Sequence, residues 1–434
     1  MKQDRFSLSQ IFPQNPILQE SLEYKNLYIA KLKEYILLLG RENEKFEKAE
    51  LQFYQKIIMQ SHNGTRKHEF SYYRYFLLID EILCLGCKLT ESEAKILMQQ
   101  YRRDFTLNRE GSRTANALVK SFTRSPARLA ELMKHPELQH ERKYLQLLNR
   151  NSQFQNKKPY RVLVTATMSA GKSTFINALT GKEICQSQNM ACTSKIHTII
   201  NKAFEDDLAY EYDHNLVLTA GAEELMNDNE ENTSDRITVA VRFNSALQNT
   251  RIVISDSPGV NFSGAAEHRE ITQEMIRTKN YDLLIYVMNA TQLATTDEEE
   301  HLAFVRQFVG NTPVLFVLNK VDELNPEKEE VAEIFQNMKN YLELHGFHKP
   351  LICPVSSQAG WMAKRELQGE LNETEQWKLW AYMGRFQKMN LPEYYATEFP
   401  RARVDCNTEQ EQLLRTSGFA YIEKIIMLRS ARRN

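Results

Sequence analysis

Five short runs of consecutive apolar residues constrain the fold of this chain more than any other feature. They lie at residues 161–166, 252–255, 283–287, 314–318 and 351–355. Strands that are apolar on both faces need cover on both sides, which is typical of a parallel sheet between two helix layers. Helical patterns separate the later runs, at residues 267–278, 298–308 and 328–344. The alternation predicts an α/β domain over residues 156–360, with a mostly parallel sheet and helices on both faces.

Helical patterns flank this α/β domain on both sides. In residues 1–155, apolar and aromatic side chains recur at three- and four-residue steps, and charged residues occupy the other faces. Thr90 and Glu93 have the spacing of a capping box, which predicts the start of a helix. The polar stretch 149–158 indicates a linker, and residues 361–434 return to a helical pattern. The sequence therefore predicts three parts: an N-terminal helical region, an α/β domain and a C-terminal helical segment.

Composition limits the class of protein and its partners. The net charge of −1 gives no overall field that would favour nucleic acid, so we expect no nucleic-acid partner. Residues 1–155 contain 25 Lys and Arg against 18 Asp and Glu, which fits a solvated helical surface and leaves an acidic lipid surface or partner open. No apolar run approaches the roughly 20 residues of a membrane-spanning helix. Six scattered cysteines do not form a disulfide framework, so we expect a cytoplasmic protein.

The segment from Ala166 to Ser173, with the sequence ATMSAGKS, has the pattern of a phosphate-binding loop except that Ala166 replaces the usual first Gly. A predicted strand precedes it and a predicted helix follows. Gly171 allows the backbone N–H groups to point at phosphate oxygens, and Lys172 supplies positive charge to the β- and γ-phosphates. The Ser173 hydroxyl is a ligand for Mg²⁺. The predicted phosphate-binding residues are Met168, Ser169, Ala170, Gly171, Lys172, Ser173 and Thr174.

Three further polar segments follow apolar runs. Asp256 begins the sequence DSPG, in which the carboxylate can hold Mg²⁺ through water and the Gly259 N–H can contact a γ-phosphate. In the sequence NKVD, the Asp322 carboxylate can accept both N1–H and N2–H of guanine, a donor pair that adenine lacks. The remaining base-binding residues that we predict are Asn319, Lys320, Ser356 and Ser357. Because these segments end separate strands at one sheet edge, they predict a guanine-nucleotide site.

A switch threonine should complete the Mg²⁺ site, and it should lie in the sequence between the phosphate loop and the NKVD segment. We expect Thr193 in this role, because a strand-like run follows it at residues 196–203. Thr198 is the alternative, as it stands inside that run. The predicted Mg²⁺ ligands are therefore Ser173, Thr193 and Asp256.

The sequence SAGKSTFINAL, at residues 169–179, resembles the phosphate loop and first helix of dynamin-like GTPases, especially bacterial ones. The sequence DSPGVN, at residues 256–261, resembles their third motif, and the resemblance covers about residues 160–360. It implies hydrolysis of GTP to GDP and phosphate. It also implies that residues 361–434 pack with the N-terminal helices as a neck or bundle, whose movement is coupled to hydrolysis.

The resemblance also bears on catalysis. Val260 stands where Ras-like enzymes carry a Gln that orients the attacking water. In dynamin-like GTPases, nucleotide-dependent dimerisation across the GTPase domains offsets this loss, and the residue at the position of Ser169 helps to stabilise the transition state. The resemblance therefore implies self-association, Mg²⁺ as cofactor, and catalytic roles for Ser169, Lys172 and Thr193. It leaves a monovalent cation, K⁺ or Na⁺, open.

Other functions stay open on the sequence alone. The chain could be a nucleotide-switched scaffold with slow turnover that recruits a partner through residues 1–155, or a GTPase of the Era and TrmE kind that acts on RNA. No apolar membrane paddle is evident. We therefore expect at most peripheral contact with a membrane surface, or contact with a partner dynamin-like chain.

Overall fold

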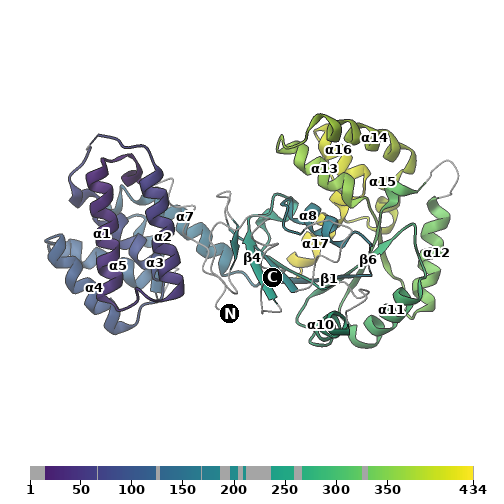
Figure 1. Cartoon of the computed structure of the whole chain (residues 1–434), viewed down its shortest axis with the longest axis horizontal. Helices are drawn as coiled ribbons and strands as arrows, with labels where there is room; N and C mark the ends of the chain where they lie inside the picture. Colours follow the sequence, from purple (N-terminus) through teal and green to yellow (C-terminus); the bar gives the residue numbers. More distant parts are fainter. Residues whose placement is uncertain are drawn as a thin grey trace. The chain divides into compact units, whose positions relative to one another are not determined.

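The computed structural model describes residues 15–65, 67–123, 128–167, 169–185, 196–203, 209–211, 236–258, 266–324 and 331–433. The chain folds into two compact units (Figure 1). The first contains the helical region up to Lys157, and the second begins at Lys158 and includes the C-terminal helices. Among the described helices, none has both the length and the apolar character needed to cross a bilayer.

The first unit is helical throughout its described part up to Lys157. Its elements are η2 (Pro16–Gln19), α1 (Leu22–Leu38), α2 (Lys45–Gln60), η3 (Phe70–Tyr73), α3 (Arg74–Cys84), α4 (Glu91–Asp104), α5 (Arg109–Thr123), α6 (Leu129–Leu132), η5 (Pro136–Leu138) and α7 (Arg142–Gln155). The predicted capping box is present at Thr90 and Glu93, where α4 begins. Every residue of α3 after Arg74 is buried, because α1, α2 and α5 pack around this helix.

A buried carboxylate organises the core of the helical unit. Asp80 on α3 accepts hydrogen bonds from Asn15 (2.8 Å), from Tyr28 on α1 (2.6 Å) and from Tyr144 on α7. Burial raises the pKa of Asp80 to about 7, although these hydrogen bonds act in the opposite direction. Since the donors come from three separate segments, the network fixes how those segments pack.

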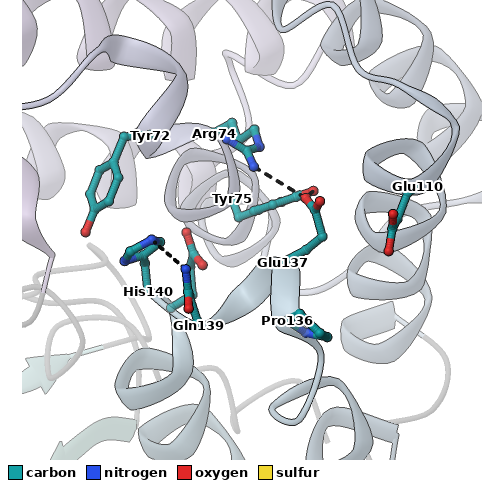
Figure 2. Close-up of a pocket in the computed structure, with 9 residues that line it drawn as sticks. Tyr72, Arg74, Tyr75, Glu110, Pro136, Glu137, Gln139 and His140 are labelled. Carbon is teal, nitrogen blue, oxygen red and sulfur yellow. Dashed lines mark hydrogen bonds and ion pairs between the residues drawn. The ribbon is translucent and has the colours of Figure 1, made fainter.

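The same unit contains a polar cavity of about 320 Å³ (Figure 2). Glu137 lines it and accepts a hydrogen bond from Tyr75 (2.8 Å), while Arg74 lies 3.4 Å from the same carboxylate oxygen. The cavity contains none of the predicted nucleotide-binding residues.

Among the described residues, the second unit contains a sheet with the strand order β4-β2-β5-β1-β6-β7-β8, and the short strand β3 falls in the stretch Ala203–Thr219, which groups with the first unit. The strands are β1 (Tyr160–Ala166), β2 (Ile196–Asn201), β3 (Tyr210–Glu211), β4 (Arg236–Val241), β5 (Ile252–Asp256), β6 (Leu283–Asn289), β7 (Val314–Asn319) and β8 (Leu351–Pro354). β2 pairs antiparallel with β5, and the pairs from β5 through β8 and between β2 and β4 are parallel. The structure confirms the mostly parallel sheet, and β6 is buried along its whole length.

Helices cover both faces of this sheet, with α8 and α13 on one side of β1 and β6, and α10 and α11 on the other (Figure 1). The helical elements are α8 (Lys172–Thr180), η6 (Ala246–Asn249), α10 (Ala266–Arg277), α11 (Thr296–Val309), η7 (Val321–Glu323), α12 (Val331–Leu344), α13 (Ser357–Leu367), α14 (Glu373–Met389), α15 (Leu391–Glu398), α16 (Glu409–Thr416) and α17 (Phe419–Ala431).

The C-terminal helices pack on the α/β domain, in the same compact unit. Their predicted packing with the N-terminal helices stays a prediction. Phe419 on α17 contacts Phe175 on α8, with ring centroids 5.8 Å apart, and α13 lies against both α8 and α16. The predicted boundary at residue 360 therefore falls inside α13. The physical reason is the apolar surface of α8, which these helices bury.

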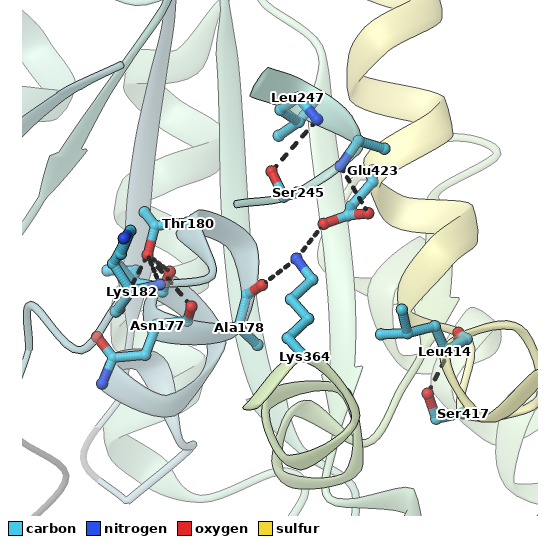
Figure 3. Close-up of polar contacts among 12 residues, drawn as sticks. Asn177, Ala178, Thr180, Lys182, Ser245, Leu247, Lys364, Leu414, Ser417 and Glu423 are labelled. Atoms are coloured by element: carbon cyan, nitrogen blue, oxygen red, sulfur yellow. Dashed lines mark hydrogen bonds and ion pairs between the residues drawn. The ribbon is translucent and has the colours of Figure 1, made fainter. Parts of the chain in front are cut away.

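A buried ion pair joins the C-terminal helices to α8. Figure 3 shows Lys364 of α13 pointing at Glu423 of α17 and at the carbonyl oxygen of Ala178 in α8. Glu423 in turn accepts a hydrogen bond from the Ala246 N–H of η6 (3.4 Å). Both charged side chains are only 4% exposed. One ion pair thus links four elements in the interior of the second unit.

Candidate functional site

The predicted phosphate loop connects the end of β1 to the start of α8. Ser169 and Gly171 both adopt left-handed backbone conformations, with φ of 61° and 83°. A Cβ on residue 171 would lie 2.4 Å from the side-chain nitrogen of Asn319, so only Gly satisfies both the conformation and the contact. The unusual φ at Ser169, a non-Gly residue, is the kind of local strain that occurs at functional sites. Met168 lies outside the described residues.

Asn319 holds three of the predicted segments together. At the end of β7, its side-chain nitrogen donates to the Ala170 carbonyl (2.8 Å), and its side-chain oxygen accepts from the Ser357 N–H (3.0 Å). The side chain is buried and both of its polar atoms have partners. The phosphate loop, the 319–322 segment and the start of α13 therefore meet at the carboxyl edge of the sheet.

The segment that begins at Asp256 reaches the same edge through β5. The parallel register of β1 and β5 places Val164 beside Asp256, and the next N–H, of Ser257, donates to the Val164 carbonyl (3.1 Å). Asp256 is fully buried and forms an ion pair with Lys172 at the start of α8. Gly259 lies outside the described residues. The charged groups of the first and second predicted motifs are thus in direct contact.

The oxygen groups at this edge fit a magnesium ion. Ser173, on the first turn of α8, offers a hydroxyl next to Lys172, and Lys172 contacts the Asp256 carboxylate. Mg²⁺ prefers oxygen ligands and is usually held by one or two protein groups, together with phosphates and water. Thr193 lies outside the described residues. The alternative, Thr198, lies inside β2 and is paired with Thr238 and Ser255.

The predicted base-binding segment forms a tight turn after β7. Lys320 has a left-handed backbone (φ 65°), η7 follows, and the Val321 N–H donates to the carbonyl of Val355, the residue directly after β8 (3.3 Å). Burial raises the pKa of Asp322, while a hydrogen bond from Ser356 and the charge of Arg385 oppose that rise. Ser356 also accepts a hydrogen bond from the Ala359 N–H (3.1 Å) and caps α13. Asp322 and Ser356 are therefore brought together.

Sequence reasoning missed Asn177, which is buried on α8. Its side-chain oxygen accepts from the N–H groups of Ile184 (3.0 Å) and Cys185 (2.8 Å), and its nitrogen donates to the Cys185 carbonyl (2.5 Å). These bonds fix the chain just before the segment that carries Thr193. The signal was available, because an Asn among apolar residues on the buried face of a helix needs hydrogen-bond partners.

A second missed feature is a buried polar chain behind the phosphate loop. The Ser257 hydroxyl donates to the Thr165 hydroxyl (3.2 Å), which lies 2.9 Å from the His301 ring. Burial lowers the pKa of His301 to about 4, so its imidazole is neutral near pH 7. This chain ties β1, β5 and α11 together beneath the site.

Comparison with known proteins shows what the α/β domain is similar to. Residues 162–321 match the model of the dynamin family. A bacterial dynamin-like protein from Nostoc punctiforme is 24% identical over 219 residues, which cover 46% of this chain and 30% of that protein. Elongation factor 1-alpha from Thermococcus kodakarensis is 26% identical over 110 residues, covering 25% of this chain and 24% of that protein.

One solved structure, an oligomerised bacterial dynamin pair described as sensing and tethering membranes, aligns with a TM-score of 0.37 and 17% identity, over 85% of this chain and 60% of that one. The matches thus span less than two thirds of these relatives' lengths. The family match includes the phosphate loop and the segment that begins at Asp256, and it ends one residue before Asp322. Residues 162–321 of this chain are therefore similar to the dynamin family.

Proposed function

We propose that this protein binds GTP and GDP and hydrolyses GTP to GDP and phosphate. The observation that carries the proposal is the convergence of the four motifs at one sheet edge. Asn319 bonds to both the phosphate loop and the start of α13, and Lys172 contacts Asp256. Parallel α/β sheets bind their ligands at this edge.

The phosphates are bound by the loop and the start of α8. The N–H groups from Ser169 to Thr174 and the positive end of the helix dipole favour an anion there. In the present structure, the Lys172 ammonium is paired with Asp256. When nucleotide binds, Lys172 turns to the β- and γ-phosphates. Ser173, Asp256 and Thr193 would hold Mg²⁺, which neutralises phosphate charge when bound.

The base is selected by Asp322. Its carboxylate accepts the N1–H and N2–H of guanine, and Lys320 lies along the base. The N–H groups of Ser356 and Ser357, which we predicted to contact O6, instead donate to the Ser417 carbonyl (3.0 Å) and to the Asn319 side-chain oxygen (3.0 Å). Adenine presents no such donor pair to the carboxylate, so the site favours GTP over ATP.

The Asp322→Asn variant should exchange guanine for xanthine specificity. An amide in place of the carboxylate presents a donor to guanine N1–H, so GDP affinity should fall by about 10- to 100-fold, as expected for lost hydrogen bonds to a charged group. Xanthine offers a carbonyl where guanine has its amino group, so xanthosine diphosphate should gain affinity. Competition against a fluorescent GDP analogue measures both changes. Unaltered guanine preference would argue against Asp322 as the base-reading residue.

Val260 cannot orient the attacking water, so catalysis requires a contribution from elsewhere. We infer that two GTPase domains associate when GTP is bound, and that Ser169, Lys172 and Thr193 then stabilise the transition state, with or without K⁺ or Na⁺ at the loop. Association would move the helices packed on the domain. The proposal extends to peripheral contact with a membrane surface, or with a partner dynamin-like chain.

Specific GTPase activity should rise several-fold with protein concentration, because a dimer forms by mass action. Phosphate release is measured from nanomolar to micromolar chain, in K⁺ and in Na⁺ buffers, with and without liposomes. The Lys172→Ala variant at the highest concentration gives the contaminating background. A specific activity that does not change with concentration would contradict dimer-driven catalysis and favour the alternative of a nucleotide-switched scaffold with slow turnover.

A further inference from the structure

Helix α14 borders the segment that carries the base-reading carboxylate. From α14, the Arg385 guanidinium donates a hydrogen bond to the carbonyl of Leu324, directly after η7. Tyr382, one turn earlier on the same helix, is half-buried and within electrostatic range of Asp322. A helix from the C-terminal segment, outside the matched GTPase residues, therefore contributes to the surroundings of the base site.

Arg385 is the cation that faces Asp322 from α14. On η7 itself, Glu323 adds a negative charge, which raises the pKa of Asp322, and the Lys320 ammonium lies 3.4 Å from Glu323. Ser356 contributes a neutral hydrogen bond and Tyr382 an uncharged phenol. Arg385 opposes the effect of Glu323, and its buried Nε–H has no hydrogen-bond partner in the part of the chain that the structure describes.

We propose that Arg385 is a positioning residue for guanine recognition. Its hydrogen bond to the Leu324 carbonyl holds the turn that carries Asp322, and its positive charge stabilises the carboxylate that accepts the two N–H groups of guanine. The inference rests on the proposed binding of GTP and GDP and assigns part of that site to the C-terminal segment. The ligand remains a guanine nucleotide.

The proposal gives a defined pH dependence. Only the ionised carboxylate can accept from both guanine N–H groups, so guanine affinity is lost as pH falls through the pKa of Asp322. Burial and Glu323 raise that pKa, whereas Arg385 and Ser356 lower it. Removal of the Arg385 charge therefore raises the pKa of Asp322, and guanine affinity is lost at a higher pH than in the unchanged protein.

The test separates the charge of Arg385 from its hydrogen bond. Arg385→Gln removes the charge and keeps an N–H donor for Leu324, whereas Arg385→Lys keeps the charge. Dissociation constants for GDP are measured on the full chain by calorimetry, from about pH 5.5 to about pH 8. Arg385→Gln should weaken GDP binding about tenfold at the acidic end and less at the alkaline end, and Arg385→Lys should keep the original profile. Lys378→Gln, the same change in charge at an exposed position of α14, should leave GDP affinity unaltered.

If Arg385→Gln loses the same GDP affinity at every pH, the electrostatic role is overturned. It is also overturned if Arg385→Lys changes the pH profile of GDP affinity as much as Arg385→Gln does. A second readout uses Asp322→Asn with xanthosine diphosphate. There the titrating carboxylate is gone, so adding Arg385→Gln should leave the pH profile unchanged, and a shift would contradict the proposal. Failure of the unchanged protein to bind GDP at any pH is a separate result, which would overturn the proposed function itself.

Discussion

The Lys172→Ala variant should lose GTP and GDP affinity by about 2–5 kcal/mol, which is on the order of 30-fold to a few thousandfold. The ammonium is the cation at the start of α8 that can neutralise the β- and γ-phosphates, and the N–H groups of the loop do not replace its charge. Calorimetry with GDP on the full chain measures the loss. Lys182→Ala, just beyond the other end of α8, is the matched control and should bind as the unchanged protein does.

The same variant leaves Asp256 buried without its ion-pair partner. A second change, Asp256→Asn, removes that unpaired charge and restores stability if the first variant unfolds. The doubly changed protein should remain folded and still fail to bind GDP. Tight GTP binding by Lys172→Ala, in folded protein, would refute the assignment of residues 166–173 as the phosphate loop.

The Lys364→Met variant should destabilise the second unit by about 3–5 kcal/mol, the usual cost of leaving a buried charge without its partner. Among the described residues, Glu423 would keep the weak hydrogen bond from the Ala246 N–H alone, and the carbonyl of Ala178 would lose its contact with the ammonium. Burial lowers the pKa of Lys364 and the Glu423 charge opposes this, so the two groups depend on each other. Urea unfolding, followed by tryptophan fluorescence, measures the effect.

Tryptophan fluorescence reports on the second unit, because all three tryptophans, at positions 361, 377 and 380, lie in that unit. The Lys364→Met and Glu423→Met double variant should recover most of the loss, since an apolar pair can replace a buried ion pair at little net cost. A single variant as stable as the unchanged protein would show that the pair does not hold α13 and α17 on the domain.

The strands and the motif positions could be predicted from local sequence. Each apolar run gave a strand of the sheet, and the phosphate loop and the NKVD segment begin at the last residues of β1 and β7, because strand, turn and helix signals span only a few residues. The antiparallel pairing of β2 with β5 was not predicted, since pairing joins residues that are distant in the chain. The roles of the site residues stay predictions, and Met168, Thr193 and Gly259 lie outside the described residues.

The C-terminal segment shows where prediction from sequence stopped. The helical pattern correctly indicated helices in residues 361–434, but it could not indicate their packing partner, because an apolar face specifies burial and not a neighbour. The structure places Lys364 against Glu423 and Phe419 against Phe175, so these helices pack on the α/β domain. Their predicted packing with the N-terminal helices as a neck rests on the resemblance and stays a prediction.

The phosphate loop at residues 166–173 was determined by the sequence itself, because left-handed turns, a helix start and a phosphate-binding lysine depend on consecutive residues. Only the tertiary structure decided that Asn319 joins this loop to Ser357, and that Arg385 reaches the turn of Asp322. Those contacts connect residues 38 to 149 positions apart. They form only when the sheet and its covering helices bring separate segments together, so no local pattern encodes them.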